Sequence, residues 1–225
     1  SDRSSEQASG VAATFTGLLE LHGSRYEADR VLAMLDDSAV RRRFALSEGD
    51  SAQVTLRAEA RFHGRAGRLM PPHGSAWLLL PETFMNASGR AVAAIANFYR
   101  IEPQDVLVVH DELDLPPGTA RLKKGGSASH NGVSEIAACL CTKDFWRLRI
   151  GIGHPGVRDA VIDYVLCPPR TEERAEFDAA ITRSLELWPL IAAANMEAAM
   201  LKLHTKEARE RQEPSAPRET KEPKP

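Results

Sequence analysis

Strand-like and helix-like segments alternate along most of this 225-residue chain, and that alternation is the strongest constraint on its fold. Short apolar runs are typical of buried strands, and apolar residues that recur every three or four positions indicate one face of a helix. The pattern predicts strands at 11–21, 51–61, 76–80, 106–109 and 146–152, and helices at 26–35, 88–99 and 133–140. A last helix is expected to start at Thr171 as its N-cap, to break or kink at Pro189 and to continue over 191–204. We expect a single α/β domain in which helices cover both faces of a twisted, mixed sheet.

The composition is that of a protein with a core and no overall attraction for polyanions. Hydrophobic residues make up 43% of the chain, and the formal net charge is −2. RNA binding would therefore need a local basic patch. The three cysteines lack Cys-x-x-Cys spacing, which predicts free thiols in a reducing compartment. No apolar run approaches the roughly 18 residues that a membrane span needs, and the histidines outside the motifs below show no metal-ligand spacing.

The two ends of the chain differ from its middle. We interpret residues 1–11 as a polar leader, 12–205 as the folded domain and 206–225 as a charged, proline-rich tail. The tail is too polar to offset its ordering entropy alone, so we expect it to contact ribosomal or other assembly proteins. The first residue is Ser1, which fits a processed N-terminus. A removed organellar presequence is one cause of such a start.

Three polar clusters follow expected strands: 83–89, 110–118 and 123–132. Ligands of open α/β sheets gather beyond the carboxyl ends of strands, so we expect the clusters to meet. In the first, Asn86 offers amide donors and an acceptor, although Asn86 or Ser88 is equally explained as a helix cap. In the second, Asp111 could orient an imidazole or a water, or belong to a charged strand exit. The third is a glycine-rich, basic loop suited to a phosphate, or a flexible surface loop.

The strand at 146–152 supports a phosphate-binding role for the third cluster. Its period of two places Leu148, Ile150 and Ile152 on one face and two arginines beside two glycines on the other. A face of this kind allows close approach by a phosphate or a backbone. The sequence therefore predicts a basic patch made of Lys123, Lys124, Arg147, Arg149 and Arg158.

With these pieces in order, the chain from Ala58 to His204 resembles bacterial-type peptidyl-tRNA hydrolase. The motifs are EARFHG, LLLPETFMNASGRAV, VLVVHDELDLPPG, KKGGSASHNGVSEI and FWRLRIGIGHPG. The resemblance implies a single α/β domain that cleaves the ester between a peptide and the 3′ end of tRNA, with water and without metal or other cofactor. It assigns substrate positioning to Asn86 and Asn131 and histidine orientation to Asp111. It also places Lys123 or Lys124, Arg149 and Arg158 at tRNA phosphates.

The family's catalytic histidine has no obvious counterpart in this chain. In the family it follows a Gly-Leu-Gly-Asn-Pro-Gly loop near the N-terminus, whereas here the matching segment places Val31 at the histidine position. Valine cannot accept a proton, and losing a positioned general base typically costs about 10²–10⁴ in rate. His22 is the one nearby histidine that could substitute. His110 and His130 lie in family motifs but would have to change role.

Three functions remain open on the sequence. The favoured hypothesis is a hydrolase-like protein that has lost its base and serves as an RNA-binding or scaffold component of a ribosome or organellar assembly. Its RNA partner would be tRNA or rRNA, and no membrane is involved. The alternative is an active peptidyl-tRNA hydrolase with a rearranged N-terminal segment. A protein-interaction module without RNA binding is the third. We expect the mitochondrial matrix as the location, with the cytoplasm as the alternative.

Overall fold

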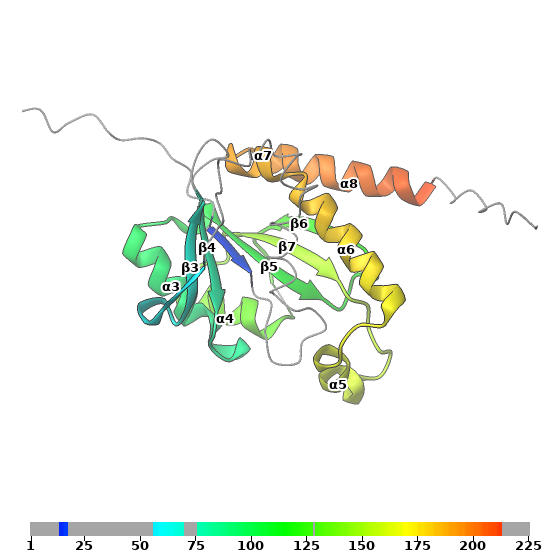
Figure 1. Cartoon of the computed structure of the whole chain (residues 1–225), viewed down its shortest axis with the longest axis horizontal. Helices are drawn as coiled ribbons and strands as arrows, with labels where there is room; N and C mark the ends of the chain where they lie inside the picture. The colour runs from blue at the N-terminus through cyan, green and yellow to red at the C-terminus, as the bar shows by residue number, and fades with distance from the viewer. Residues whose placement is uncertain (1–13, 18–55, 70–75, 128, 213–225) are drawn as a thin grey trace, which may run out of the picture.

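The computed structural model describes residues 14–17, 56–69, 76–127 and 129–212, which form a seven-stranded sheet with helices around it (Figure 1). The strands are β1 (Thr14–Gly17), β2 (Arg57–Glu59), β3 (Gly64–Leu69), β4 (Ala76–Pro81), β5 (Val106–Glu112), β6 (Ala120–Lys124) and β7 (Trp146–Gly151). The helices are α3 (Ser88–Tyr99), α4 (Asn131–Cys139), α5 (Val161–Leu166), α6 (Thr171–Leu185), α7 (Trp188–Ala192) and α8 (Met196–Gln212). Single 3₁₀ turns lie at 60–62, 85–87, 103–105 and 158–160.

The sheet is mixed, and its strand order β2-β3-β4-β1-β5-β7-β6 decides where the polar clusters lie. Strands β4, β1, β5 and β7 are parallel neighbours, so their carboxyl ends share one edge. Strands β2, β3 and β6 are antiparallel to the strands beside them. Asp111 and Glu112 are the last two residues of β5, and they therefore lie at the edge where parallel sheets bind ligands.

Helices cover both faces of the sheet, as the sequence predicts. On one face, Val106 and Val108 of β5 pack with apolar residues of α3 and α4. On the other face, Leu107 and Val109 pack with residues of α7 and α8. The alternation of neighbouring β5 residues between these two clusters is the period of two expected for a buried strand. A further cluster joins α6 to Leu80 and Ile152.

Most of the expected elements within the described residues are confirmed, and the differences have local reasons. Helix 88–99 and the strands at 76–80, 106–109 and 146–152 are present, with β5 extended to Glu112. The expected strand at 51–61 is wrong in its last part, because the chain turns into a 3₁₀ helix at Ala60 and His63 then adopts a left-handed conformation. Strands β3 and β6 were not predicted, since glycine and lysine interrupt their alternation.

The C-terminal helices end and begin at breaks that the sequence indicated only in part. Thr171 is not an N-cap but the first residue of α6, where Glu173 accepts a hydrogen bond from the backbone N–H of Arg170 at 2.9 Å. The break expected near Pro189 is confirmed, because α6 ends at Leu185 and Pro189 lies in the first turn of α7. A second break, not predicted, lies at Ala194, which has a φ of 59°. Helix α8 continues to Gln212, beyond the expected boundary at 205. No described helix is both long and apolar enough to cross a bilayer.

Candidate active site

The centre of the candidate site is an imidazole–carboxylate pair. His130 lies immediately before α4, and its Nε2 is 3.1 Å from Oδ1 of Asp111 at the end of β5. Nδ1 of the same ring accepts the backbone N–H of Val133 at 3.3 Å, which caps the helix. Because Nδ1 accepts, Nε2 carries the proton and donates it to Asp111. The expected lone aspartate therefore has an imidazole partner, supplied by a different part of the chain from the one that the resemblance indicates.

The pair is partly enclosed, and its charges support one another. The side chain of His130 is 12% exposed and that of Asp111 is 33% exposed. Burial alone would raise the pKa of Asp111, but the hydrogen bond and charge of His130, together with His110, hold that pKa below its ordinary value. Asp111 is therefore ionised at neutral pH and fixes the protonated nitrogen of His130.

Two glycines bring the candidate asparagines together. Gly89 of α3 packs on α4 so closely that a Cβ there would lie 2.6 Å from the carbonyl oxygen of Glu135. The carboxylate of Glu135 also accepts the N–H of Gly89. At the other contact, a Cβ on Gly132 would meet Met85 at 3.1 Å. Because Asn86 adjoins Met85 and Asn131 adjoins Gly132, these contacts bring the turn that carries Asn86 against the start of α4.

The structure does not support the helix-cap interpretation of the first cluster. Asn86 lies within the 3₁₀ turn 85–87 and is exposed, and neither that turn nor α3 has a side-chain cap. Ser88 is fully buried, and its hydroxyl has no hydrogen-bond partner within the described residues. Asn131 is also exposed, as the first residue of α4. The amides of both asparagines are therefore accessible to a ligand.

The third cluster reaches the site by a route that the sequence did not indicate. Strand β6 is antiparallel to β7, so Lys124 pairs with Trp146 at the edge opposite Asp111. The residues after β6, 125–127, lie against Arg147 of β7. Arg147, only 2% exposed, holds them by hydrogen bonds to the carbonyl oxygens of Gly125 and of Ser127, the latter at 3.2 Å. Burial of this guanidinium lowers its pKa.

The predicted basic patch is divided by the structure. Lys123, Arg147 and Arg149 share a face of the sheet, whereas Lys124 is on the opposite face, 3.4 Å from Asp144 and over the ring of Trp146. Nε of Arg149 is 2.8 Å from Oε2 of Glu112, so this arginine is neutralised. Lys123 is exposed, and Arg158 begins the 3₁₀ turn 158–160. The prediction of a single open patch of five cations is therefore wrong. Arg147 is buried, Arg149 is ion-paired and Lys124 faces away.

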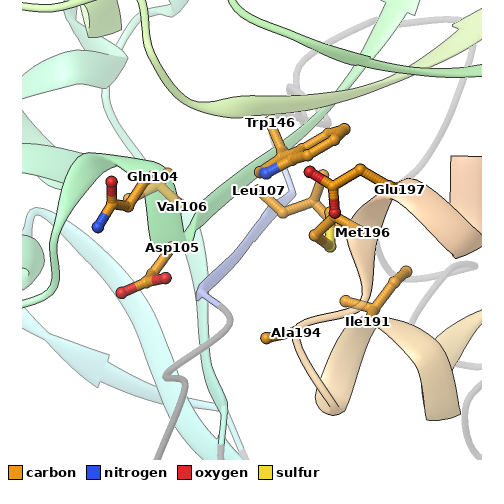
Figure 2. A pocket seen from close by; sticks show the side chains of 9 residues that line it. All are labelled: Gln104, Asp105, Val106, Leu107, Trp146, Ile191, Ala194, Met196 and Glu197. Atoms are coloured by element: carbon orange, nitrogen blue, oxygen red, sulfur yellow. The ribbon is translucent and has the colours of Figure 1, made fainter.

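A cavity of about 90 Å³ lies at the other edge of the sheet, away from the pair (Figure 2). Its walls come from the residues before β5, the first residues of β5 and β7, and the α7–α8 region. The lining residues are Gln104, Asp105, Val106, Leu107, Trp146, Ile191, Ala194, Met196 and Glu197. Because β5 runs between this cavity and Asp111, the cavity is not part of the candidate active site.

His130 and Arg147 are the residues of the site to which sequence reasoning gave no such role. A signal for His130 was available, since a polar residue directly before a helix is a candidate cap and His130 directly precedes Asn131. No local signal identifies Arg147 as a loop anchor, because its partners are backbone carbonyls 20 and 22 residues away. His22 and Val31 lie outside the described residues. Within those residues, no group of three His, Cys, Asp or Glu side chains is placed to hold a metal ion.

Comparison with known proteins identifies one family over most of the chain. A family profile described as peptidyl-tRNA hydrolase matches residues 44–212. Proteins named peptidyl-tRNA hydrolase from Nitrosospira multiformis and Thiobacillus denitrificans are 60% and 56% identical, over 157 and 156 residues. Both alignments cover 69% of this chain, with 82% and 75% of the respective relatives. A profile for the fourth domain of the RecBCD subunit RecC also matches residues 8–61, too small a part of the chain to show a family.

Solved structures agree with this result. The crystal structure of peptidyl-tRNA hydrolase from Acinetobacter baumannii superposes with a TM-score of 0.73 at 34% identity, and the match covers 86% of this chain and 95% of that one. The expected α/β fold is therefore confirmed. The relatives named here are bacterial, so the comparisons give no support to a mitochondrial location.

Proposed function

This chain belongs to the peptidyl-tRNA hydrolase family, and on that premise we propose that it hydrolyses the ester bond of peptidyl-tRNA with the His130–Asp111 pair as its acid–base element. The 3.1 Å contact between Nε2 of His130 and Oδ1 of Asp111 is the observation that carries the proposal. An imidazole oriented by a carboxylate is an arrangement suited to general-base catalysis.

In this mechanism the second nitrogen of His130 takes the proton of the attacking water. The Val133 N–H contact to Nδ1 is 3.3 Å, at the long end of the hydrogen-bond range, so a water can replace it at modest cost. Water oxygen bonds to the ester carbonyl carbon and its proton passes to Nδ1. The bond from that carbon to the ribose oxygen then breaks, and the proton passes to the leaving oxygen. Asp111 stabilises the imidazolium throughout, and the released Val133 N–H is available to the oxyanion.

The other residues of the site would bind the two parts of the substrate. Asn86 and Asn131 are exposed beside the pair and would position the carbonyl or ribose groups. Lys123 pairs with Arg147, which in turn pairs with Val108 of β5. Val108 is three residues before Asp111, so Lys123 lies about 10 Å from Asp111 along the strand direction. At that separation it would contact a phosphate while the ester lies at His130. The reaction needs no cofactor.

A second function, RNA binding without hydrolysis, is favoured by one observation. The sequence places Val31 at the position of the family's histidine. If His130 remains a helix cap, the site would grip the acceptor end of a tRNA and have no base. In that case the protein would be an RNA-binding component of a translation assembly.

Turnover of purified peptidyl-tRNA by the full chain separates the two functions. We expect multiple turnovers, and a decrease of about 10²–10⁴ in kcat for His130→Gln. Glutamine can still donate to Asp111 from the equivalent of Nε2 but cannot accept a proton at the position of Nδ1. Failure of the wild-type chain to turn over would support the binding function, and so would activity gained by Val31→His. Full activity in His130→Gln would exclude His130 as the base and direct attention to His22.

Lys123 and Lys124 form a matched pair for testing the RNA-binding surface. We expect Lys123→Ala to weaken tRNA binding and to reduce the slope of log affinity against log salt by about one. Lys124→Ala should change neither, because Lys124 lies on the opposite face beside Asp144. Filter binding or fluorescence anisotropy across a salt series measures both variants. Equal effects of the two substitutions would contradict the division of the patch.

A further inference from the structure

His110 is a buried titratable residue that the proposed mechanism does not use. It precedes Asp111 in β5 and has no exposed surface. Its Nδ1 is 2.7 Å from the main-chain oxygen of Asp111. Its ring centre lies 5.0 Å from that of His130, with 58° between the ring planes. One side chain therefore contacts both members of the His130–Asp111 pair.

The environment of His110 keeps its imidazole neutral. Burial, then the positive charge of His130, lowers its pKa to about 3, and Arg147 acts in the same direction. The contacts to Asp111 oppose this shift but do not outweigh it. A neutral ring whose Nδ1 faces a carbonyl oxygen must carry its proton on Nδ1 and donate it there.

The same tautomer leaves Nε2 of His110 as a bare acceptor. This atom is buried and has no hydrogen-bond partner within the described residues. An unsatisfied buried acceptor is destabilising, so an apolar side chain of the same shape would fill this space at lower cost. The interaction made by Nδ1 is therefore the feature that an apolar replacement would lose.

We propose that His110 is a positioning residue for the His130–Asp111 pair: its Nδ1–H fixes the main chain of Asp111 and, through it, the carboxylate that orients His130. Holding the Asp111 carbonyl sets the direction in which the carboxylate leaves the end of β5. A carboxylate held in that direction accepts the hydrogen bond from Nε2 of His130 and so orients that ring. The kinetic consequence depends on the proposed hydrolase function, whereas the orientation itself does not.

Three substitutions of His110 distinguish the contribution of its Nδ1 donor from that of its ring. His110→Asn places an amide donor at the position of Nδ1, His110→Gln places one near Nε2, and His110→Phe keeps a ring without any donor. We expect kcat of the Asn variant to stay within about threefold of wild type, and kcat of Gln and Phe to decrease about 10- to 100-fold, with KM unchanged. His204→Phe is the control, because His204 also has a buried, unpartnered Nε2 but lies on α8 in no proposed site. Equal activities of the Asn and Phe variants would overturn the proposal.

Long-range ¹H–¹⁵N NMR correlations of the histidines test the orientation without any turnover. In the wild-type chain we expect a neutral Nδ1–H form of His110 between about pH 5 and 8 and an Nε2–H form of neutral His130. The His130 Nε2–H signal should persist in His110→Asn and should broaden or disappear in His110→Phe. An Nε2–H tautomer of His110, or an unchanged His130 signal in the Phe variant, would overturn the proposal. If the chain proves inactive but these signals are as expected, the hydrolase proposal fails and the positioning role stands.

Discussion

Asp105 and Asp111 lie at opposite ends of β5, and their environments differ in one essential respect. Burial acts to raise the pKa of both carboxyls. At Asp105 the nearby Glu102 adds to that effect, so its pKa is raised. At Asp111 the hydrogen bond and charge of His130 reverse it, so its pKa is lowered. A partly buried acid at a strand end becomes a candidate catalytic group here because an imidazole reaches it, and burial alone does not distinguish the two.

The surroundings of the two acids extend this difference. The cavity beside Asp105 contains a second carboxylate, that of Glu197, and its nine lining residues include no Lys, Arg or His (Figure 2). At the other edge, Glu112 is ion-paired to Arg149, and Asp111 accepts a hydrogen bond from His130. Position along the sheet explains the contrast, because Arg149 of β7 and His130 before α4 both lie near the carboxyl end of β5.

The largest expected effect is on catalysis, and its absence would contradict the difference between Asp111 and Asp105. We expect Asp111→Asn to lower kcat for peptidyl-tRNA by about 10²–10⁴, because the neutral amide no longer stabilises the imidazolium of His130. Asp105→Asn should leave kcat unchanged, since that carboxyl lies at the opposite edge. Steady-state hydrolysis with both variants measures this, and circular dichroism checks that both are folded. A similar loss in the two variants would mean that the aspartates act through stability.

An intermediate effect is expected on acid unfolding. The folded-state pKa of His110 is about 3, compared with an ordinary value of 6.5, among the neighbouring groups Asp111, His130 and Arg147. This buried imidazole therefore contributes stability that is fully present above about pH 6.5 and is lost as the pH falls toward 3. In His110→Asn, the free energy of unfolding should fall less steeply between pH 6 and 4, by up to about 1.4 kcal/mol per pH unit. Urea titrations at several pH values measure the slope, and an unchanged slope would show that His110 protonates in the folded state.

The smallest expected effects are on the carboxyl groups themselves, and they sharpen the comparison. Removing the hydrogen-bond partner in His130→Ala should raise the pKa of Asp111, because burial is then opposed only by weaker contacts. Removing the like charge in Glu102→Gln should lower the pKa of Asp105. Carboxyl ¹³C chemical shifts followed against pH report both values. Shifts in the same direction would contradict the assigned causes.

The strands at the centre of the sheet and helix α3 were predictable because their apolar residues recur with a clear period. Helix 88–99 was predicted to the residue, and the run 106–109 correctly placed Asp111 at a strand end. Strand β6 was not predicted, and its direction decides that Lys123 faces Arg147 while Lys124 faces away. Alternation along a strand is visible in a sequence, but whether the strand runs parallel or antiparallel depends on the neighbour with which it pairs.

The sequence alone determined the family, the α/β architecture and the identity of Asp111, Asn86 and Asn131 as candidate groups, because each depends on residue type and order within a short segment. The tertiary structure decided which imidazole meets Asp111 and how Arg147 holds the loop before that imidazole. It also decided which lysine shares a face of the sheet with Arg147. Those choices join residues 19 to 24 positions apart, and contacts at such separations leave no period in the chain. The physical reason is that a hydrogen bond or ion pair depends on proximity in space, which only the packed strands and helices provide.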